Sequence, residues 1–204
     1  MKRRSGDEKF IIGDKPAVFT VKDFWSWSYS DMMINTYRGL LAEFLVAQAL
    51  GVANDESRFF HPNYDIEFIV NAKTYGIEVK ASAYRQSWGD GKIDKGTTKP
   101  SFDISQSFRR PYSNPPEKGR FSDVYVFCLH NEKCASKADA LNLSQWSFYP
   151  VATWRITKKF SDQKRSRISK INDLTDPFSF NELRKEVVRI ITTDIMEPSN
   201  SIAF

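Results

Sequence analysis

The chain has 204 residues, enough for one domain with a sizeable core. Hydrophobic residues make up 41% and charged residues 27%, and no apolar run reaches the roughly 18 residues of a membrane span. Thirty Lys and Arg against 25 Asp and Glu give a net charge of +5, a mild preference for polyanionic partners. The two cysteines, Cys128 and Cys134, have no zinc-type spacing with other Cys or His residues. We therefore expect a cytoplasmic protein with reduced thiols and no membrane partner.

We expect residues 1–19 to form a loosely held N-terminal arm with a basic tip, residues 20–197 a single domain, and residues 198–204 a C-terminal tail. The spacing of Thr20 and Asp23 is that of a capping box and predicts the start of a helix. Aromatic residues follow at once: Phe24, Trp25, Trp27 and Tyr29. Such residues could stack on bases, but packing in the core is the expected role.

A second helix is predicted over residues 31–50. Its most informative residue is Glu43, which is the only charged residue between Gly39 and Asn54. Its neighbours at helical spacing are small or apolar, so the carboxylate should be partly buried, and burying it unpaired costs free energy. Glu43 therefore needs a metal ion, a lysine or a hydrogen-bond donor. Arg38 lies one turn earlier and could cap Glu43 or reach a phosphate.

The central stretch of the chain, residues 63–82, reads as a β-hairpin. Apolar and polar residues alternate over 64–70 and again over 77–82, with turn residues over 71–76 between them. One face of this hairpin is apolar, and the other presents Asp65, Glu78 and Lys80 together. Alternation of this kind is also typical of any amphipathic strand with one solvated face, where Glu78 and Lys80 would form a weak surface pair.

Two carboxylates on neighbouring strands suit Mg²⁺, which prefers oxygen ligands and keeps several waters. A lysine beside them could orient or deprotonate a metal-bound water and neutralise a phosphate. Metal and lysine together are suited to phosphodiester hydrolysis, because the cation polarises the phosphoryl oxygen and lowers the pKa of its water.

The order of these residues resembles the PD-(D/E)xK nuclease superfamily. Asp65 matches the first carboxylate, Glu78-Val79-Lys80 matches the ExK, and Glu43 stands where a preceding helix often carries an inward-pointing Glu. The chain departs from the family in one place, because Tyr64 stands where Pro usually precedes the Asp. Residues 24–150 also resemble a group of uncharacterised bacterial restriction-endonuclease-like proteins.

The resemblance implies an α/β fold of restriction-endonuclease-like topology, with a mixed β-sheet of four or five strands flanked by helices. It implies that Asp65, Glu78 and the Val79 carbonyl hold Mg²⁺, with Mn²⁺ as a substitute. Lys80 would position or activate the water, and Glu43 would support the metal or its water. Two further residues could hold the scissile phosphate or equally be turn residues: Ser82 and Gln86.

The rest of the chain supports an α/β domain that binds a polyanion. Residues 85–120 read as a basic, Gly- and Pro-rich connection around a short strand at 101–104, which suits a phosphate-binding loop or a solvated one. Strands are predicted over 122–129 and 146–153, and a last amphipathic helix over 180–191. Residues 155–170 are the most basic stretch, and we expect DNA contacts from Lys158, Lys159, Lys164, Arg165 and Arg167.

The function that these features indicate is that of a Mg²⁺-dependent DNA endonuclease in restriction, defence or repair. One alternative is a catalytically inactive nucleic-acid-binding or assembly module on the same fold. Another is a nuclease for RNA or single strands. Cutting both strands of a duplex calls for two active sites, which suggests a homodimer or a partner subunit of a defence system.

Overall fold

A computed structural model describes residues 3–53, 57–58, 61–88, 92–93, 98–111 and 114–196. Its centre is a four-stranded sheet in the order β11-β10-β4-β3. The strands are β3 (Ile66–Val70), β4 (Lys73–Ala83), β10 (Val124–His130) and β11 (Trp146–Ala152). The sheet is mixed, because β10 runs parallel to β4 and the other two pairs are antiparallel. The expected α/β class, with a mixed sheet flanked by helices, is thus confirmed.

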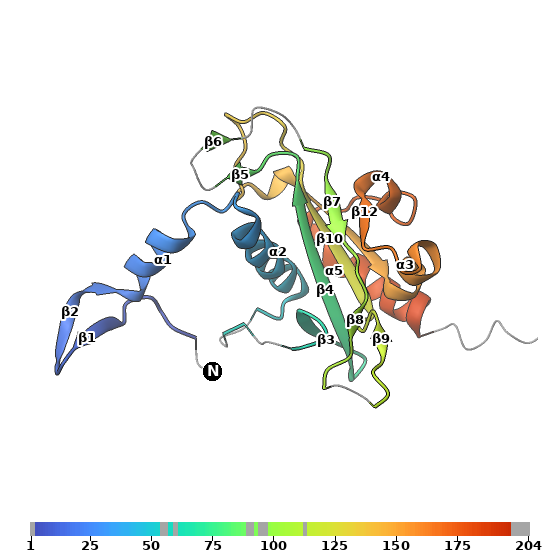
Figure 1. Ribbon diagram of the computed structural model, residues 1–204, viewed down its shortest axis with the longest axis horizontal. Helices are drawn as coiled ribbons and strands as arrows, with labels where there is room; N and C mark the ends of the chain where they lie inside the picture. Colours follow the sequence, from blue (N-terminus) through green and yellow to red (C-terminus); the bar gives the residue numbers. More distant parts are fainter. Residues whose placement is uncertain are drawn as a thin grey trace, which may run out of the picture.

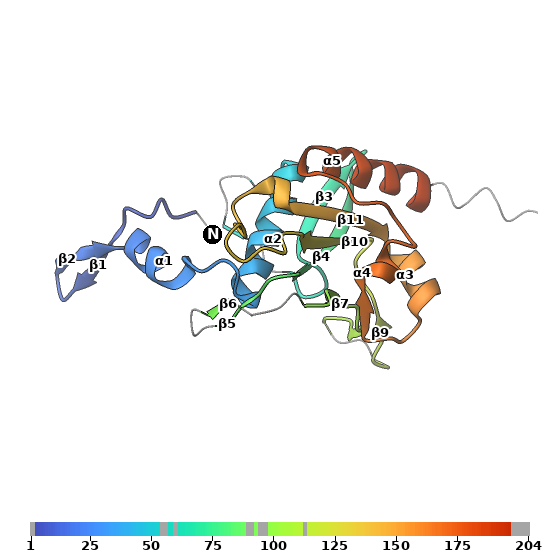
Figure 2. The same cartoon turned by 90° about the horizontal axis from the view of Figure 1, so that it is seen from above.

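Helices cover both faces of this sheet (Figures 1 and 2). On one face lie α2 (Asn35–Leu50), α5 (Phe180–Arg189) and the π-helical segment η2 (Ile190–Ile195). On the other lie α3 (Thr153–Phe160) and α4 (Ile168–Ile171), together with a small antiparallel pair, β7 (Ser101–Asp103) and β12 (Arg165–Arg167). The short elements are β5 (Ser87–Trp88), β6 (Lys92–Ile93), β8 (Ser107–Phe108), β9 (Lys118–Gly119) and the 3₁₀ turn η1 (Leu143–Gln145).

The apolar pattern of each strand matches its place in the sheet. All seven residues of β10 are buried, as expected for a central strand covered on both faces. In β3 burial alternates, with Ile66, Phe68 and Val70 inside. β11 lies at the sheet edge, a position that tolerates Pro150, which has no N–H to donate to a neighbouring strand. Among the described residues, no helix combines the length and apolarity needed to cross a bilayer.

The turn of the β3–β4 hairpin is shorter than the sequence indicated. It consists of Asn71 and Ala72, both with positive φ, and β4 already begins at Lys73. Gly76 therefore lies within β4 and its φ is not positive. Glycine is required there for another reason, since a Cβ at Gly76 would lie 2.5 Å from the ring of Tyr64.

The N-terminal residues form a folded extension that includes α1 and is therefore longer than the arm of residues 1–19 expected from the sequence. From here on, the arm means residues 3–29. It consists of the hairpin β1 (Lys9–Ile12) and β2 (Lys15–Thr20) followed by α1 (Val21–Tyr29), and it projects from the body (Figure 1). The capping box of Thr20 and Asp23 is present. The expectation that the aromatic residues of α1 pack in the core is wrong: α1 has no buried residue, because it extends away from the sheet.

Parts of two expected segments lie outside the described residues. These are the C-terminal tail, residues 198–204, and residues 89–91, 94–97 and 112–113 of the basic connection. The described part of that connection contains β7, where a strand was expected, and the short pairs β5–β6 and β8–β9.

Candidate active site

Asp65 is held against the ExK strand by two hydrogen bonds, one from its main chain and one to its carboxylate. It immediately precedes β3, and continuing the register of Ile66 opposite Ile77 places it opposite Glu78. Its own N–H donates to the Ile77 carbonyl at 3.0 Å. Its carboxylate Oδ2 accepts the N–H of Val79 at 2.8 Å. The first carboxylate of the expected motif is thus attached to the strand that carries the second.

Glu78 and Lys80 form a partly buried ion pair on β4. Lys80 Nζ donates to Glu78 Oε1 at 2.5 Å, and the two side chains are 30% and 18% exposed respectively. Burial raises the pKa of Glu78, with the charges of Asp65 and Glu43 adding to the effect and Lys80 opposing it. Burial works to lower the pKa of Lys80, but Glu78 and Asp65 outweigh it, so the net pKa is raised. The raised pKa means that Lys80 keeps its proton at neutral pH.

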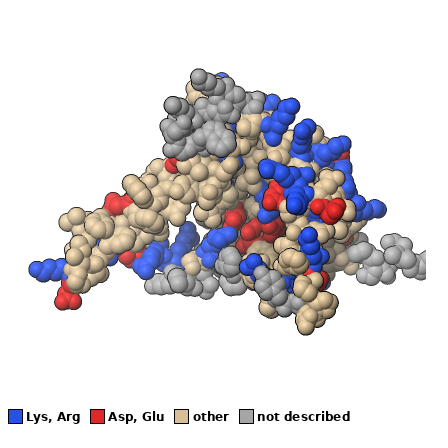
Figure 3. All heavy atoms as spheres, viewed as in Figure 1, with Lys and Arg blue, Asp and Glu red and all other residues tan. Residues whose placement is uncertain are grey.

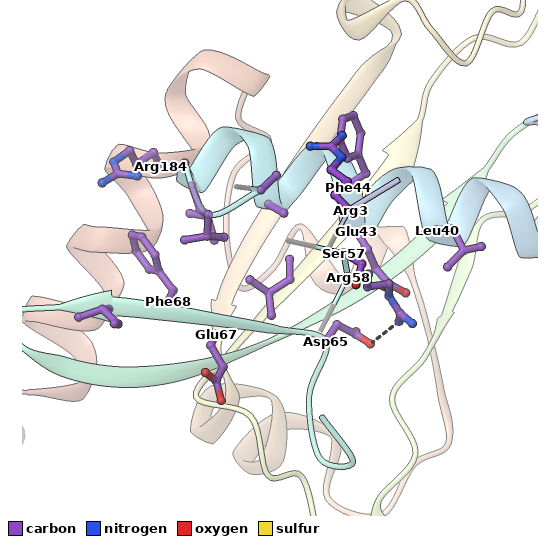
Figure 4. A pocket seen from close by; sticks show the side chains of 17 residues that line it. Arg3, Leu40, Glu43, Phe44, Ser57, Arg58, Asp65, Glu67, Phe68 and Arg184 are labelled. Carbon is purple, nitrogen blue, oxygen red and sulfur yellow. Dashed lines mark hydrogen bonds and ion pairs between the residues drawn. The ribbon is translucent and has the colours of Figure 1, made fainter. Parts of the chain in front are cut away.

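Glu43 reaches the same region from α2 and finds its partner in Arg58. Arg58 Nε donates to Glu43 Oε2 at 2.5 Å, and an Nη atom lies 3.8 Å from Asp65 Oδ1. Figure 4 shows Arg58 between the two carboxylates. Burial raises the pKa of Glu43 and Asp65 adds to this, while Arg58 opposes it. Glu43 has the partner that its apolar surroundings required, although neither Arg38 nor a lysine supplies it.

A groove of about 650 Å³ opens beside this cluster, between α2, β3 and α5. Glu43, Arg58 and Asp65 lie at one end of it, and Phe68 and Arg184 lie at the other (Figure 4). Its walls are largely apolar, with Leu40 and Phe44 of α2 among them. The acidic cluster therefore borders both the polar face of the hairpin and an apolar groove.

The donor set fits a hard divalent cation by its chemistry. Asp65, Glu78 and the Val79 carbonyl offer oxygen alone, and a cation would offset the charge that the pKa of partly buried Glu78 shows to be unfavourable. As arranged, no three His, Cys, Asp or Glu side chains within the described ranges are grouped closely enough to hold a metal. A Mg²⁺ ion here would rest on two carboxylates and a carbonyl, with water completing its shell.

Three of the expected phosphate-binding residues differ in how far they are exposed to solvent. Arg38 is 2% exposed and donates to the Met33 carbonyl at 2.7 Å and to Asn35 Oδ1. Burial lowers its pKa to about 10. The expectation that Arg38 reaches a phosphate is therefore wrong, because its guanidinium supports the start of α2. Ser82 is 5% exposed, and Gln86 lies partly exposed beyond the end of β4.

The expected DNA-contacting residues are exposed on α3, β12 and the turn between them: Lys158, Lys159, Lys164, Arg165 and Arg167. Lys159 is paired with Asp173 at 2.8 Å. Figure 3 shows Asp and Glu side chains gathered in the middle of the molecule, where Figure 1 places β3 and β4. Lys and Arg side chains surround them on the side where β7, β12, α3 and α4 lie.

Two charged residues near the site were not predicted from the sequence, Arg58 and Asp103. Arg58 stands between the helix and the hairpin, and only its position between two acidic elements could have indicated its role. Asp103 lies on β7 opposite Arg165, and its charge acts on Lys80. Burial works to raise the pKa of Asp103, but hydrogen bonds from Ser105 and the nearby cations outweigh it, so the pKa is lowered.

The site thus belongs to a mixed α/β domain with acidic and basic side chains grouped at the β3–β4 edge. No protein-family model, curated protein or solved structure matches the chain.

Proposed function

We propose that the chain is a metal-dependent nuclease of the PD-(D/E)xK type that cleaves DNA. The observation that carries this proposal is the 2.8 Å hydrogen bond between the Asp65 carboxylate and the N–H of Val79. It joins the first carboxylate to the Glu78-Val79-Lys80 strand, with Glu43 approaching from α2. A surface pair on an ordinary amphipathic strand would not need a third and a fourth partly buried charge beside it.

The residues have distinct roles in this proposal. Asp65, Glu78 and the Val79 carbonyl would hold Mg²⁺ or Mn²⁺, and Glu43 would support the metal or its water. When bound, the ion polarises a phosphoryl oxygen and lowers the pKa of a water. Lys80, which keeps its proton, orients that water and offsets negative charge on the phosphate. The exposed basic residues of α3 and β12 supply phosphate contacts without reading sequence.

One observation favours a second candidate, a nucleic-acid-binding or assembly module without catalysis. Arg58 and Lys80 already neutralise the carboxylates that would hold the metal. A protein with that arrangement would bind nucleic acid through its basic surface and would not cleave it. Titration of the protein with Mg²⁺ and Mn²⁺ by calorimetry separates the two candidates, because the module would bind neither ion at this site.

The direct test is cleavage of supercoiled, linear and single-stranded DNA, and of RNA, with Mg²⁺, Mn²⁺ or EDTA. The wild-type chain is compared with Lys80→Ala and with Lys73→Ala. The second variant is the control, because it removes an exposed lysine from the same strand. We expect metal-dependent cutting that Lys80→Ala abolishes and Lys73→Ala retains. Equal cutting by all three would remove Lys80 from the mechanism, and preference for RNA or single strands would redefine the substrate. The roles in restriction, defence or repair remain predictions that the substrate profile would begin to separate.

A further inference from the structure

The arm exposes an unusual number of large apolar side chains. Trp27 is 85% exposed, and Val18 is 95% exposed. The others are Phe10, Ile11, Ile12, Phe19, Phe24, Trp25 and Tyr29. Of the described residues 9–29 of the arm, Ala17 alone is buried. Exposed apolar side chains in such number mark an interaction site, because leaving them in water is unfavourable.

The area involved is that of a stable protein interface. An aromatic side chain buries about 150–250 Å² when fully covered. With their exposed fractions taken into account, the nine side chains offer on the order of 1,000 Å². Each partner of a stable complex contributes about 800 Å². Because adjacent strand residues point to opposite sides, one partner surface would cover part of this area, and a reciprocal second contact would add to it.

The same chain carries an apolar surface that the arm could cover. Leu40 and Phe44 of α2, at 38% and 44% exposure, and Ile69 of β3, at 66%, line the 650 Å³ groove. Arg3, at the N-terminal end of the arm, also lines it, whereas none of the large apolar residues of the arm does. In Figure 1 the arm extends away from the sheet, and β1 and β2 lie at its far end. Within the described chain, nothing covers the exposed apolar side chains of the arm or those of the groove.

We propose that two copies of the chain exchange arms, so that exposed apolar side chains of each arm pack into the α2–β3 groove of the other copy. Reciprocal exchange about a two-fold axis covers both surfaces of both copies and closes the assembly. β3 is an edge strand of the sheet, and such an edge can accept main-chain contacts from an added segment. The partner's arm would then lie beside Glu43 and Asp65, so each candidate active site would be bounded by both copies.

The test is the mass of the full chain in solution by light scattering or sedimentation. We expect a dimer of about 47 kDa, twice the 23.6 kDa of one chain. Trp27→Asp on the arm and Phe44→Asp in the groove should each give a monomer, because both residues are exposed and a charge there leaves the folded chain intact. Leu141→Asp, at a residue 66% exposed outside both surfaces, should remain a dimer.

Mixing the two variants gives a sharper result. A Trp27→Asp copy keeps an intact groove, and a Phe44→Asp copy keeps an intact arm, so the mixture restores one of the two contacts. We expect the mixture to contain a dimer that neither variant forms alone. A monomeric wild-type chain would overturn the proposal, and so would a dimer that both substitutions leave unchanged, since the arm would then serve another partner. Mass is measured without substrate, so this outcome is independent of any nuclease activity.

Discussion

The carboxylate of Asp65 accepts the main-chain N–H of Val79, and this bond ties the beginning of β3 to the middle of β4. Because one Asp65 oxygen accepts this structural hydrogen bond, substitution of Asp65 by Asn and by Ala should have different effects on stability. Asn keeps an acceptor for the Val79 N–H, whereas Ala leaves that partly buried donor without one.

We therefore expect Asp65→Asn to lose metal-dependent cleavage while its free energy of unfolding changes by less than about 1 kcal/mol. Asp65→Ala should lose cleavage and also destabilise the chain by about 1–3 kcal/mol. Denaturant unfolding beside a cleavage assay measures both. Equal stability of the two variants would show that the hydrogen bond to Val79 contributes little.

Arg58 competes with a cation for the same carboxylates. It contacts Glu43 at 2.5 Å and lies 3.8 Å from Asp65. Removing its charge in Arg58→Ala should raise Mg²⁺ affinity roughly five- to tenfold, because a repelling cation is lost. Glu43 is only 17% exposed and would lose its partner, so Arg58→Ala without metal should also lower the free energy of unfolding, by about 1–3 kcal/mol. Calorimetric titration with Mg²⁺ measures the first effect, and weaker binding in the variant would mean that Arg58 supports the site instead.

The raised pKa of Glu43 gives a pH dependence with a definite sign. Between the ordinary carboxyl pKa of 4.5 and the raised folded pKa, the folded chain binds more protons than the unfolded chain. The free energy of unfolding without metal should therefore fall as pH rises through this window. Glu43→Gln cannot titrate, and its unfolding free energy should show a smaller slope. If the slope of Glu43→Gln equals that of the wild-type chain, the pH dependence arises from another residue, and Glu78 is the next one to replace.

Two glycines should respond in opposite directions to the same change. Gly76→Ala places a Cβ 2.5 Å from the ring of Tyr64, and we expect it to destabilise the chain by about 1–3 kcal/mol. Gly39→Ala, in α2, meets nothing within 4 Å and should stabilise the chain by about 0.5–1 kcal/mol, because alanine favours the helix. Thermal or denaturant unfolding of both variants measures this. A tolerated Gly76→Ala would mean that Tyr64 moves aside at little cost.

Local patterns in the sequence were sufficient for the main elements of the fold. Alternation over β3 and β4, the largely apolar β10 and the cap at Thr20 each depend on residues a few positions apart. The apolar surroundings of Glu43 likewise indicated a partly buried carboxylate that needs a partner. These features are short-range consequences of burial and hydrogen bonding, so periodicity and spacing carry them.

The tertiary structure alone decided which distant residues meet. Arg58 pairs with Glu43 across 15 positions of the chain, and Asp103 acts on Lys80 from β7, which lies on the other face of the sheet. Arg38 and the aromatic residues of α1 show the reverse case, since a charged side chain is buried and apolar ones are exposed. Burial depends on what packs against a residue from elsewhere in the chain or from a second copy, and a local pattern does not contain that information.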